Sequence, residues 1–478
     1  MFDSKEEILE TAKDFLNGCA YGRSVETLET FNAKPKLRRK EMKKKGILAI
    51  LGMVLAFMLL AAPAGAYYAN DHVAVAPNGE GDVLVYPLYI ALDGLSTQFQ
   101  VINTSTSLST VVKIVLRSHQ YSQEVLDFLI FLSPNDVFNG TIFYTNGQYK
   151  LTSSDGSLCL PNGTCADAAA PLTFTLTPPC NGETDSEAYG YIVGIEAWAG
   201  IVGESETDPG TVDKADIQAA YNAAKEGGFD TCDTADIITG NAKLDFIGTD
   251  ISGYEADTLK NYRNLEEIDV ANETILGADA NNNLCEIEAA LSKNKLVVPY
   301  YNNASILVAT FPTKLADCPD SNGDYTALGP FFDEDQNLSP GYTSILFDDE
   351  EHSFSTGCVT SPCTPEKKSF PEETNLLLLS SNYTQGWGRI SFTTGATDDN
   401  PAYTECYDYY DDILGYTGAP VVGLIAHFTA DGFVLARPAY SWGGVYSGYY
   451  DTYYEEGEYQ LTPGADGGVY RFCDDMVP

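Results

Sequence analysis

Closely spaced acidic and amide side chains are the first groups in this chain whose types suggest a chemistry. Asp320, Asn322 and Asp324 place oxygen atoms at every second position, as a calcium-binding loop does at its start. Tyr325 and Phe331 stand where an EF-hand needs Gly and Glu, so the segment is not an EF-hand. A calcium site here must therefore be irregular.

Asp333 and Asp335 lie in the next acidic loop along the chain. Because Ca²⁺ accepts carboxylates from separate loops, we predict that at least one of these acidic loops binds calcium. The candidate ligands are then Asp320, Asn322, Asp324, Asp333 and Asp335. The other interpretation is a solvated acidic surface without bound metal.

Aromatic and acidic residues alternate near the C-terminus. Tyrosine has a large rigid ring with a hydrogen-bonding tip, which suits protein interfaces and sugar-stacking surfaces. We predict that this segment contacts a partner or a ligand through Tyr440, Trp442, Tyr446, Tyr449, Tyr450, Tyr453 and Tyr454. The alternative is a pair of tyrosine-rich strands that packs on its own domain.

Paired carboxylates are the only residues that suggest catalysis. A glycosidase needs two acids that flank one bond, and Glu196 (beside Trp198) and the pair Asp408 and Asp411 are the available choices. In so acidic a chain such pairs arise by chance. The GxSxG motif of serine hydrolases is absent from the sequence. We therefore predict no catalytic residues and no enzymatic activity.

The cysteines are spaced like those of a disulfide-bonded exported protein. Ten of the eleven follow residue 66, and an even number in an exported chain indicates disulfides rather than metal ligands. Cys159 with Cys165 and Cys358 with Cys363 enclose short turn-like segments. Two further pairs, Cys285 with Cys318 and Cys406 with Cys473, are suggested by closeness along the chain and by which cysteines are still unpaired.

An export signal precedes all of these residues. Residues 43–45 are three lysines, residues 46–62 are apolar, and Ala64-Gly65-Ala66 is a small-residue cleavage site. This pattern predicts a secretory signal peptide over residues 42–66 and an extracellular or cell-surface protein. The rival interpretation is an uncleaved membrane anchor. We interpret residues 1–41, which precede the signal, as a non-native or misannotated extension.

The charge of the chain excludes one class of partner. Lys and Arg total 27 against 68 Asp and Glu, a net charge of -41 at pH 7. Without residues 1–66, 16 basic residues face 60 acidic ones. A nucleic-acid binder needs a basic surface, so we exclude nucleic acid as a partner. Self-repulsion at this charge favours bound cations such as Ca²⁺, or other partners.

Short runs of β-branched and aromatic residues separated by turn residues predict a mainly β fold. We expect two β-sandwich, immunoglobulin-like domains over residues 67–200 and 293–478. Residues 201–292 break the strand pattern, and helical spacing over 213–226 and 284–292 predicts a helix-containing insertion between them.

Seven stretches carry a resemblance that spans residues 80–430. They are residues 81–89, 101–105, 125–137, 190–193, 308–314, 386–392 and 418–423. In these stretches the chain resembles a group of exported β-rich surface proteins of Gram-negative bacteria for which no activity is established. The resemblance implies a shared secreted architecture and transfers no catalytic residue.

These observations favour a secreted, non-catalytic structural protein of the envelope, extracellular matrix or a filament. Disulfides and calcium would stabilise it, and its partners would be further copies of itself or other envelope components. The alternative is a secreted adhesin-like module that binds glycans or another ligand. A secreted glycosidase is the third hypothesis.

Overall fold

The computed structural model describes the chain from residue 73 to residue 448, with internal gaps. The chain divides into two compact units, residues 1–68 and 69–478, and every described residue belongs to the second. The longer gaps are 160–171, 176–188, 203–211, 228–234, 247–251, 263–282, 315–330, 333–338, 349–352, 356–367, 380–384, 394–403 and 408–412. The predicted extension and signal peptide lie outside the described residues.

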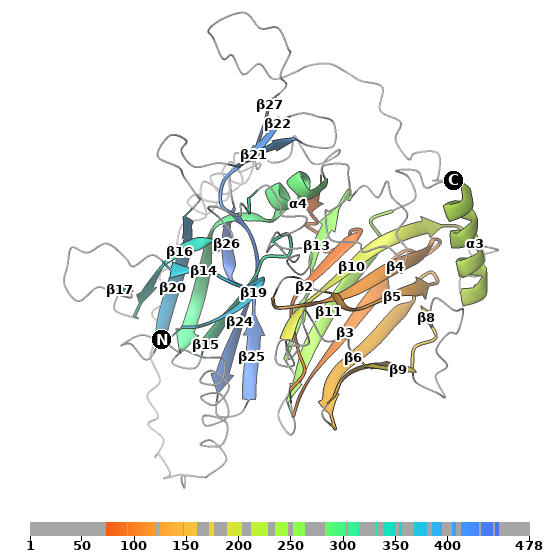
Figure 1. The fold of residues 1–478 in the computed structure, drawn as a ribbon, viewed down its shortest axis with the longest axis horizontal. Helices are drawn as coiled ribbons and strands as arrows, with labels where there is room; N and C mark the ends of the chain where they lie inside the picture. Colours follow the sequence, from red (N-terminus) through yellow and green to blue (C-terminus); the bar gives the residue numbers. More distant parts are fainter. Residues whose placement is uncertain are drawn as a thin grey trace, which may run out of the picture. The chain divides into compact units, whose positions relative to one another are not determined.

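Two antiparallel sheets form an N-terminal sandwich (Figure 1). The first has the order β1-β13-β2-β10-β4-β5-β8, with strands β1 (Ala74–Val75), β13 (Asp257–Lys260), β2 (Val83–Ile90), β10 (Tyr189–Gly200), β4 (Ser109–Ser118), β5 (Glu124–Leu132) and β8 (Leu158–Cys159). The second has the order β12-β11-β3-β6-β7-β9, with strands β12 (Ser252–Glu255), β11 (Ile238–Phe246), β3 (Leu95–Asn103), β6 (Val137–Thr145), β7 (Gln148–Ser153) and β9 (Leu172–Thr175).

Alternating apolar residues create the core between these two sheets. Phe99 and Val101 on β3 are buried at every second position and share one apolar cluster with Val112 and Ile114 on β4. The Phe99 ring contacts Tyr86 on β2 edge-on, with ring centroids 5.9 Å apart. Both sheets thus bury one face against the other.

The outer face of the first sheet is also buried, which explains why β4 is buried at all of its positions. Helices α3 (Lys214–Gly227) and α4 (Asn283–Leu291) cover it. Ile217 and Tyr221 on α3 and Ile287 and Leu291 on α4 belong to the apolar cluster on this face, as helical spacing requires. Neither helix of the described part has the length and apolar character that a membrane crossing requires.

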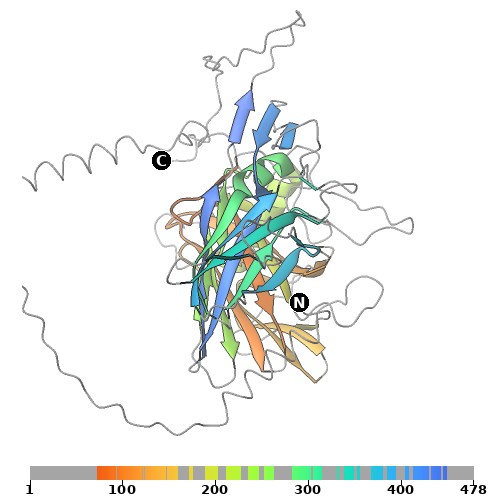
Figure 2. The same cartoon turned by 90° about the vertical axis from the view of Figure 1, so that its left-hand side faces the viewer.

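A C-terminal sandwich lies on the side of the N-terminal one opposite α3, and Figure 2 looks onto it. One sheet has the order β17-β16-β20-β14-β23, with β18 on β16 and β26 on β14. Its strands are β14 (Ser292–Asn302), β16 (Gly341–Phe347), β17 (Ser353–Ser355), β18 (Lys368–Ser369), β20 (Gln385–Thr393), β23 (Ala419–Pro420) and β26 (Ala439–Trp442).

The facing sheet has the order β19-β15-β24-β25. Its strands are β19 (Thr374–Leu378), β15 (Ser305–Thr310), β24 (Val422–Thr429) and β25 (Gly432–Ala436). A small sheet of β21 (Thr404–Tyr407), β22 (Ile413–Tyr416) and β27 (Val445–Gly448) is formed nearer the C-terminus.

The β19-β15-β24-β25 sheet has no solvent-facing side at its centre. Leu307 and Ile425 pack into the core of the C-terminal sandwich, whereas their strand neighbours Val308 and Leu424 belong to the core of the N-terminal sandwich. Adjacent residues of a strand point to opposite faces, so this one sheet takes part in both cores. The two sandwiches therefore share a continuous apolar interior.

The predicted mainly β, sandwich-type fold is confirmed, and both predicted helices are present. The sequence placed the break between sandwiches at residue 200. In the structure, β11 and β12 complete one sheet of the N-terminal sandwich and β13 pairs with β2 in the other. Residues 238–260 are thus part of the first sandwich, because strand pairing is decided between distant segments.

Candidate functional site

Acid–base side chains gather where the two sandwiches meet. We call this region the junction and define it by His119, Tyr189, Lys314, Glu372 and Glu373. His119 follows β4, Tyr189 begins β10, Lys314 follows β15, and the two glutamates directly precede β19. Strand ends from both sandwiches therefore supply the junction.

A buried histidine organises one half of the junction. The His119 ring stacks on Tyr189, with centroids 4.1 Å apart, and its Nε2 atom lies 3.7 Å from Glu372 Oε2. The Tyr189 hydroxyl donates a hydrogen bond of 3.0 Å to that same oxygen. The His119 carbonyl oxygen accepts from the backbone N–H groups of Glu373 and Thr374 at 2.9 and 3.2 Å. These contacts attach the start of β19 to the end of β4.

A buried ion pair forms the other half. Lys314 Nζ lies 3.5 Å from Glu373 Oε1, and both side chains are almost fully buried. Lys314 also donates to the carbonyl oxygen of Pro371. Burial lowers the pKa of Lys314, and the neighbouring Glu373 carboxylate opposes that shift. Removing either partner would leave an uncompensated buried charge, so this pair disfavours any other arrangement of the two strands.

A second polar contact between the sandwiches lies away from the junction. Arg437, after β25, donates to Asp257 Oδ1 on β13 at 2.7 Å and to the carbonyl oxygen of Glu255. Lys293 on β14 donates to the Leu291 carbonyl oxygen at 2.8 Å. Burial lowers the pKa of Lys293 to about 7, although nearby Asp257 favours the charged amine.

Three carboxyl groups form a buried cluster within the N-terminal sandwich. We call it the carboxyl cluster and define it by Asp82, Glu196 and Asp236. Asp82 Oδ2 accepts a hydrogen bond of 2.7 Å from the Tyr262 N–H, and Asp236 Oδ1 accepts one of 2.9 Å from the Asn261 N–H. Burial, followed by the charges of Asp236 and Glu196, raises the pKa of Asp82 well above its usual value.

Glu196 is the member that the sequence had suggested for glycosidase chemistry. Its Oε2 accepts from the Ala235 N–H at 2.8 Å, and the Thr110 hydroxyl lies 2.9 Å from both Glu196 Oε1 and the Trp198 carbonyl oxygen. The side chain is fully buried, and burial raises its pKa to about 8. A fully buried carboxyl presents no surface to a glycosidic bond in this structure, so the geometry does not favour the catalytic interpretation of Glu196. Asp408 and Asp411 lie outside the described residues.

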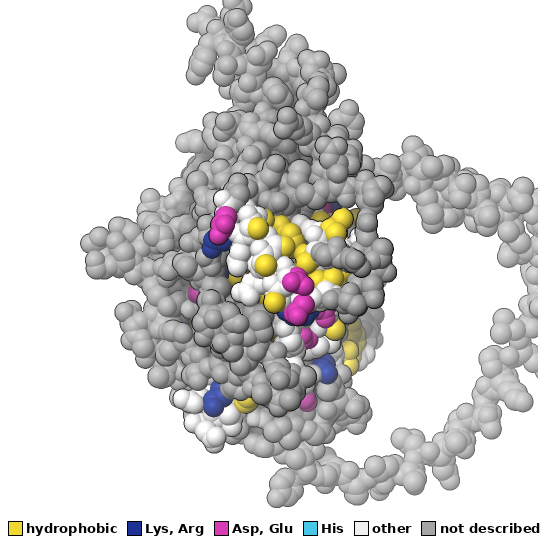
Figure 3. All heavy atoms as spheres, turned by 90° about the vertical axis from the view of Figure 1, so that its right-hand side faces the viewer, with side chains coloured by type: hydrophobic (Ala, Val, Ile, Leu, Met, Phe, Trp, Pro, Cys, Tyr) yellow, Lys and Arg dark blue, Asp and Glu magenta, His cyan; other side chains and the backbone are white. Residues whose placement is uncertain are grey.

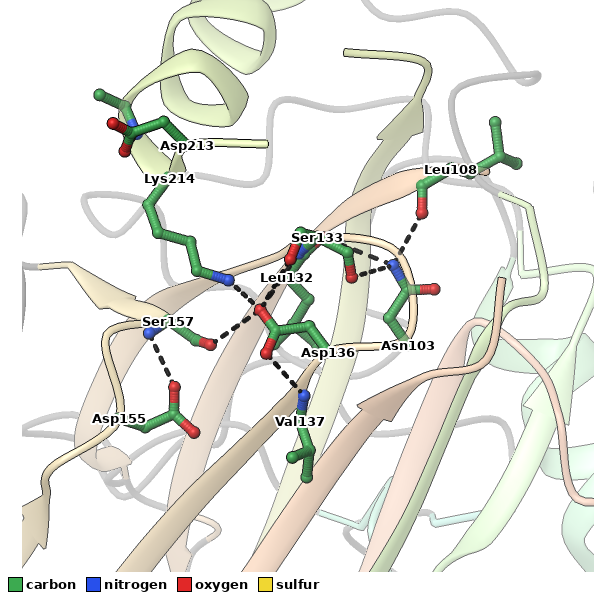
Figure 4. Close-up of polar contacts among 11 residues, drawn as sticks. Asn103, Leu108, Leu132, Ser133, Asp136, Val137, Asp155, Ser157, Asp213 and Lys214 are labelled. Carbon is green, nitrogen blue, oxygen red and sulfur yellow. Dashed lines mark hydrogen bonds and ion pairs between the residues drawn. The ribbon is translucent and has the colours of Figure 1, made fainter. Parts of the chain in front are cut away.

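Another polar cluster attaches α3 to the end of the N-terminal sandwich (Figure 4). Asp136 Oδ2 accepts hydrogen bonds from Lys214 Nζ, from the Ser133 N–H at 3.2 Å and from the Ser157 hydroxyl at 3.3 Å. Its Oδ1 accepts from the Val137 N–H at 2.9 Å. Burial lowers the pKa of Lys214 to about 8. One carboxylate thus ties the β5–β6 turn, the segment before β8 and the helix together.

Asn103 closes the same end of the sandwich (Figure 4). Its amide nitrogen donates to the carbonyl oxygens of Leu108 and Ser133 at 2.8 and 3.0 Å, and its oxygen accepts from the Ser105 N–H at 3.0 Å. The stretches 101–105 and 125–137, which the resemblance singled out separately, therefore meet in one hydrogen-bonded group. Their role in the fold is structural.

The predicted calcium ligands Asp320, Asn322, Asp324, Asp333 and Asp335 all lie outside the described residues, so the calcium site stays a prediction. Within the described ranges no group of three or more His, Cys, Asp or Glu side chains is arranged to hold a metal ion. Several described acidic residues accept hydrogen bonds or form ion pairs, among them Glu372 and Glu373 of the junction.

The predicted aromatic contact surface is only partly described. Tyr440 and Trp442 lie in β26, which pairs with β14, and Tyr446 lies in β27, which pairs with β22. The backbone of the first part of this segment thus belongs to strands of the C-terminal region, and the predicted contact through these side chains stays a prediction. Tyr449, Tyr450, Tyr453 and Tyr454 lie outside the described residues.

Of the predicted disulfide cysteines, Cys285 is buried on α4, whereas its predicted partner Cys318 lies outside the described residues. The backbones of Cys159 and Cys406 are placed in β8 and β21. The four predicted pairings stay predictions, since Cys165, Cys318, Cys358, Cys363 and Cys473 also lie outside.

Sequence reasoning missed the junction altogether. No local pattern links His119 to Glu372, which is more than 250 positions away. Comparisons with protein-family models, curated proteins and solved structures find no match to this chain. The function of this protein must therefore be inferred from the geometry of its fold.

Proposed function

We propose that the protein is an exported, non-catalytic structural protein that assembles into an envelope layer, matrix or filament. One observation carries this proposal: the β19-β15-β24-β25 sheet takes part in the cores of both sandwiches. Two domains that share an apolar interior, and that His119 and Tyr189 join through their contacts with Glu372, move as one body. Rigidity of this kind suits a building block better than an enzyme that closes on a substrate.

The surface supports a role for cations in assembly. Acidic and apolar side chains lie next to one another on the face shown in Figure 3, which is the α3 side of Figure 1. Copies of so acidic a chain repel one another unless cations lie between them. Calcium binding by the acidic loops would reduce this repulsion.

Electron microscopy of the purified chain from residue 67 to residue 478 tests the proposal, in calcium and in chelator. We expect ordered sheets or fibres, with calcium promoting them. A matched variant that lacks residues 449–478 keeps β26 and β27 and shows whether the aromatic tail is needed. Dispersed monomers under all conditions would rule out self-assembly as the function.

Glycan or ligand binding is a second candidate function, favoured by an exposed aromatic pair. Trp387 on β20 is 38% exposed and stacks on Phe347 of β16, with centroids 4.1 Å apart and rings inclined by 9°. Glycan-array binding by monomers that is lost in Trp387→Ala would support this function. Binding that survives this change but requires residues 449–478 would assign it to the tail instead.

A further inference from the structure

A lysine lies in the middle of an apolar sheet face. Lys113 on β4 is fully buried, and its neighbours on the same face are Val111 and Val115 along the strand and Leu129 and Ile195 across it. Val111, Leu129 and Ile195 belong to the buried apolar cluster of this face. Val115 is buried as well, like every other residue of β4. Burying an ammonium group among such residues costs several kcal/mol unless its charge is compensated or removed.

The carboxyl group of Asp127 lies directly beside this amine. Lys113 Nζ is 3.0 Å from Asp127 Oδ2, and Asp127 lies diagonally from Lys113 on β5, opposite Val115. That oxygen is buried and makes no hydrogen bond. A nucleophile that is held beside the group it attacks reacts as if it were at very high concentration.

A second carboxyl group completes the arrangement. Glu124, also on β5, interacts electrostatically with Asp127, Arg117 and Lys113. Burial is the main reason that the pKa of Glu124 is raised to about 7; Asp127 also raises it, whereas Arg117 and Lys113 lower it. Arg117 Nη2 lies 3.8 Å from Glu124. Glu124 is thus suited to move protons near neutral pH.

We propose that Lys113 and Asp127 become joined by an intramolecular amide bond once the sheet has folded, with Glu124 as the proton-transfer group. Proton transfer within the ion pair gives the Lys113 amine and the Asp127 carboxylic acid; the amine attacks Asp127 Cγ, the new C–N bond forms, and one C–O bond of that carboxylic acid breaks. Glu124 takes a proton from the nitrogen and delivers it to the departing hydroxyl, so that one water molecule leaves and no electrons are transferred. The product replaces a buried ion pair by a neutral amide. This inference does not rest on the proposed function.

Mass spectrometry of the reduced, denatured chain tests the bond. The N-terminus of the purified chain is identified in the same digest, because the expected mass depends on it. We expect the whole chain to weigh one water molecule less than its sequence requires. Trypsin should fail to cleave after Lys113, and a branched peptide should link the segment containing Lys113 to residues 118–150. A wild-type chain at its full sequence mass, cleaved after Lys113, would overturn the proposal.

Variants locate the reaction. Lys113→Arg and Glu124→Gln should each have the full mass of their own sequences, because the first lacks the nucleophile and the second the proton-transfer group. Lys214→Arg is the matched control, since its ion pair with Asp136 lies at the sheet end, and it should keep the loss of water. Loss of water that persists in Lys113→Arg would place the reaction elsewhere and reject the assignment. If a variant does not fold, the mass of the wild-type chain still shows whether the amide bond has formed.

Discussion

The Thr310 hydroxyl donates a hydrogen bond of 2.7 Å to the carbonyl oxygen of Pro87, and this contact joins the two sandwiches at a fully buried point. Thr310 ends β15 in the shared sheet, and Pro87 lies within β2. A carbonyl group buried in a shared core has no water to replace a lost partner, so the hydroxyl satisfies a group that apolar packing cannot.

Replacing that hydroxyl should weaken both sandwiches together. In Thr310→Val the Pro87 carbonyl keeps its burial and loses its donor, which we expect to cost about 1–3 kcal/mol of unfolding free energy. Chemical denaturation followed by fluorescence measures this cost. Thr343→Val, on the partly exposed face of β16, is the control and should change stability by less than about 0.5 kcal/mol. Equal effects of the two changes would contradict the role assigned to Thr310.

Truncating Leu424 tests whether the core is shared. Leu424→Ala leaves a cavity at the contact between the sandwiches and should cost about 2–5 kcal/mol. Hydrogen exchange should accelerate in β4 of the N-terminal sandwich as well as in β14 of the C-terminal one, because both depend on the same interior. Val434→Ala, at a side chain 54% exposed on β25, should leave exchange unchanged. Acceleration confined to the C-terminal sandwich would show that the cores are independent.

The carboxyl cluster predicts that the free energy of unfolding falls as pH rises. Burial raises the pKa of Glu196 from 4.5 to about 8, so the folded chain keeps this proton in a range where the unfolded chain has lost it. The stabilisation is complete below pH 4.5 and is lost as pH rises through about 8. Asp82 and Asp236 act in the same direction, since their pKa values are also raised.

Glu196→Gln should make the free energy of unfolding depend less on pH. The amide resembles the protonated carboxyl, because it can donate to the Thr110 oxygen while the Thr110 hydroxyl donates to the Trp198 carbonyl oxygen. Between pH 5 and 8 the slope of unfolding free energy should become shallower by up to about 1.4 kcal/mol per pH unit. Glu80→Gln on the surface is the control. An unchanged slope in Glu196→Gln would mean that Glu196 is ionised in the folded chain.

Replacing Asp136 should lower the stability of the fold more than replacing Lys214, the lysine that it binds. Asp136→Ala removes the acceptor of the Ser133 and Val137 N–H groups and of the Ser157 hydroxyl, and we expect a cost of about 2–3 kcal/mol. Lys214→Ala removes only a partly exposed ion pair, worth about 0–1 kcal/mol. Thermal unfolding of both variants measures the order. The reverse order would mean that holding α3 is the main role of this cluster.

Residue periodicity alone was enough to predict the fold class and both helices. Alternation in stretches such as residues 99–102 predicts one buried face for a strand, and the 3.6-residue spacing of Ile217 and Tyr221 predicts the buried side of α3. These signals are local, because the side-chain direction of a residue follows from the backbone geometry of its own strand or helix.

The candidate sites depended on tertiary structure. The sequence offered Glu196 only as one carboxylate among many and gave no sign of the burial that raises its pKa, and His119 acquired Glu372 as a partner only through the packing of two sandwiches. Local periodicity specifies that a strand has an apolar side, but it does not specify which distant strand covers that side. The sequence therefore determined the β-rich character of the chain. Only the folded chain decided which acids are buried and which lysine meets which carboxylate, because those contacts join segments whose separation along the chain leaves no local pattern.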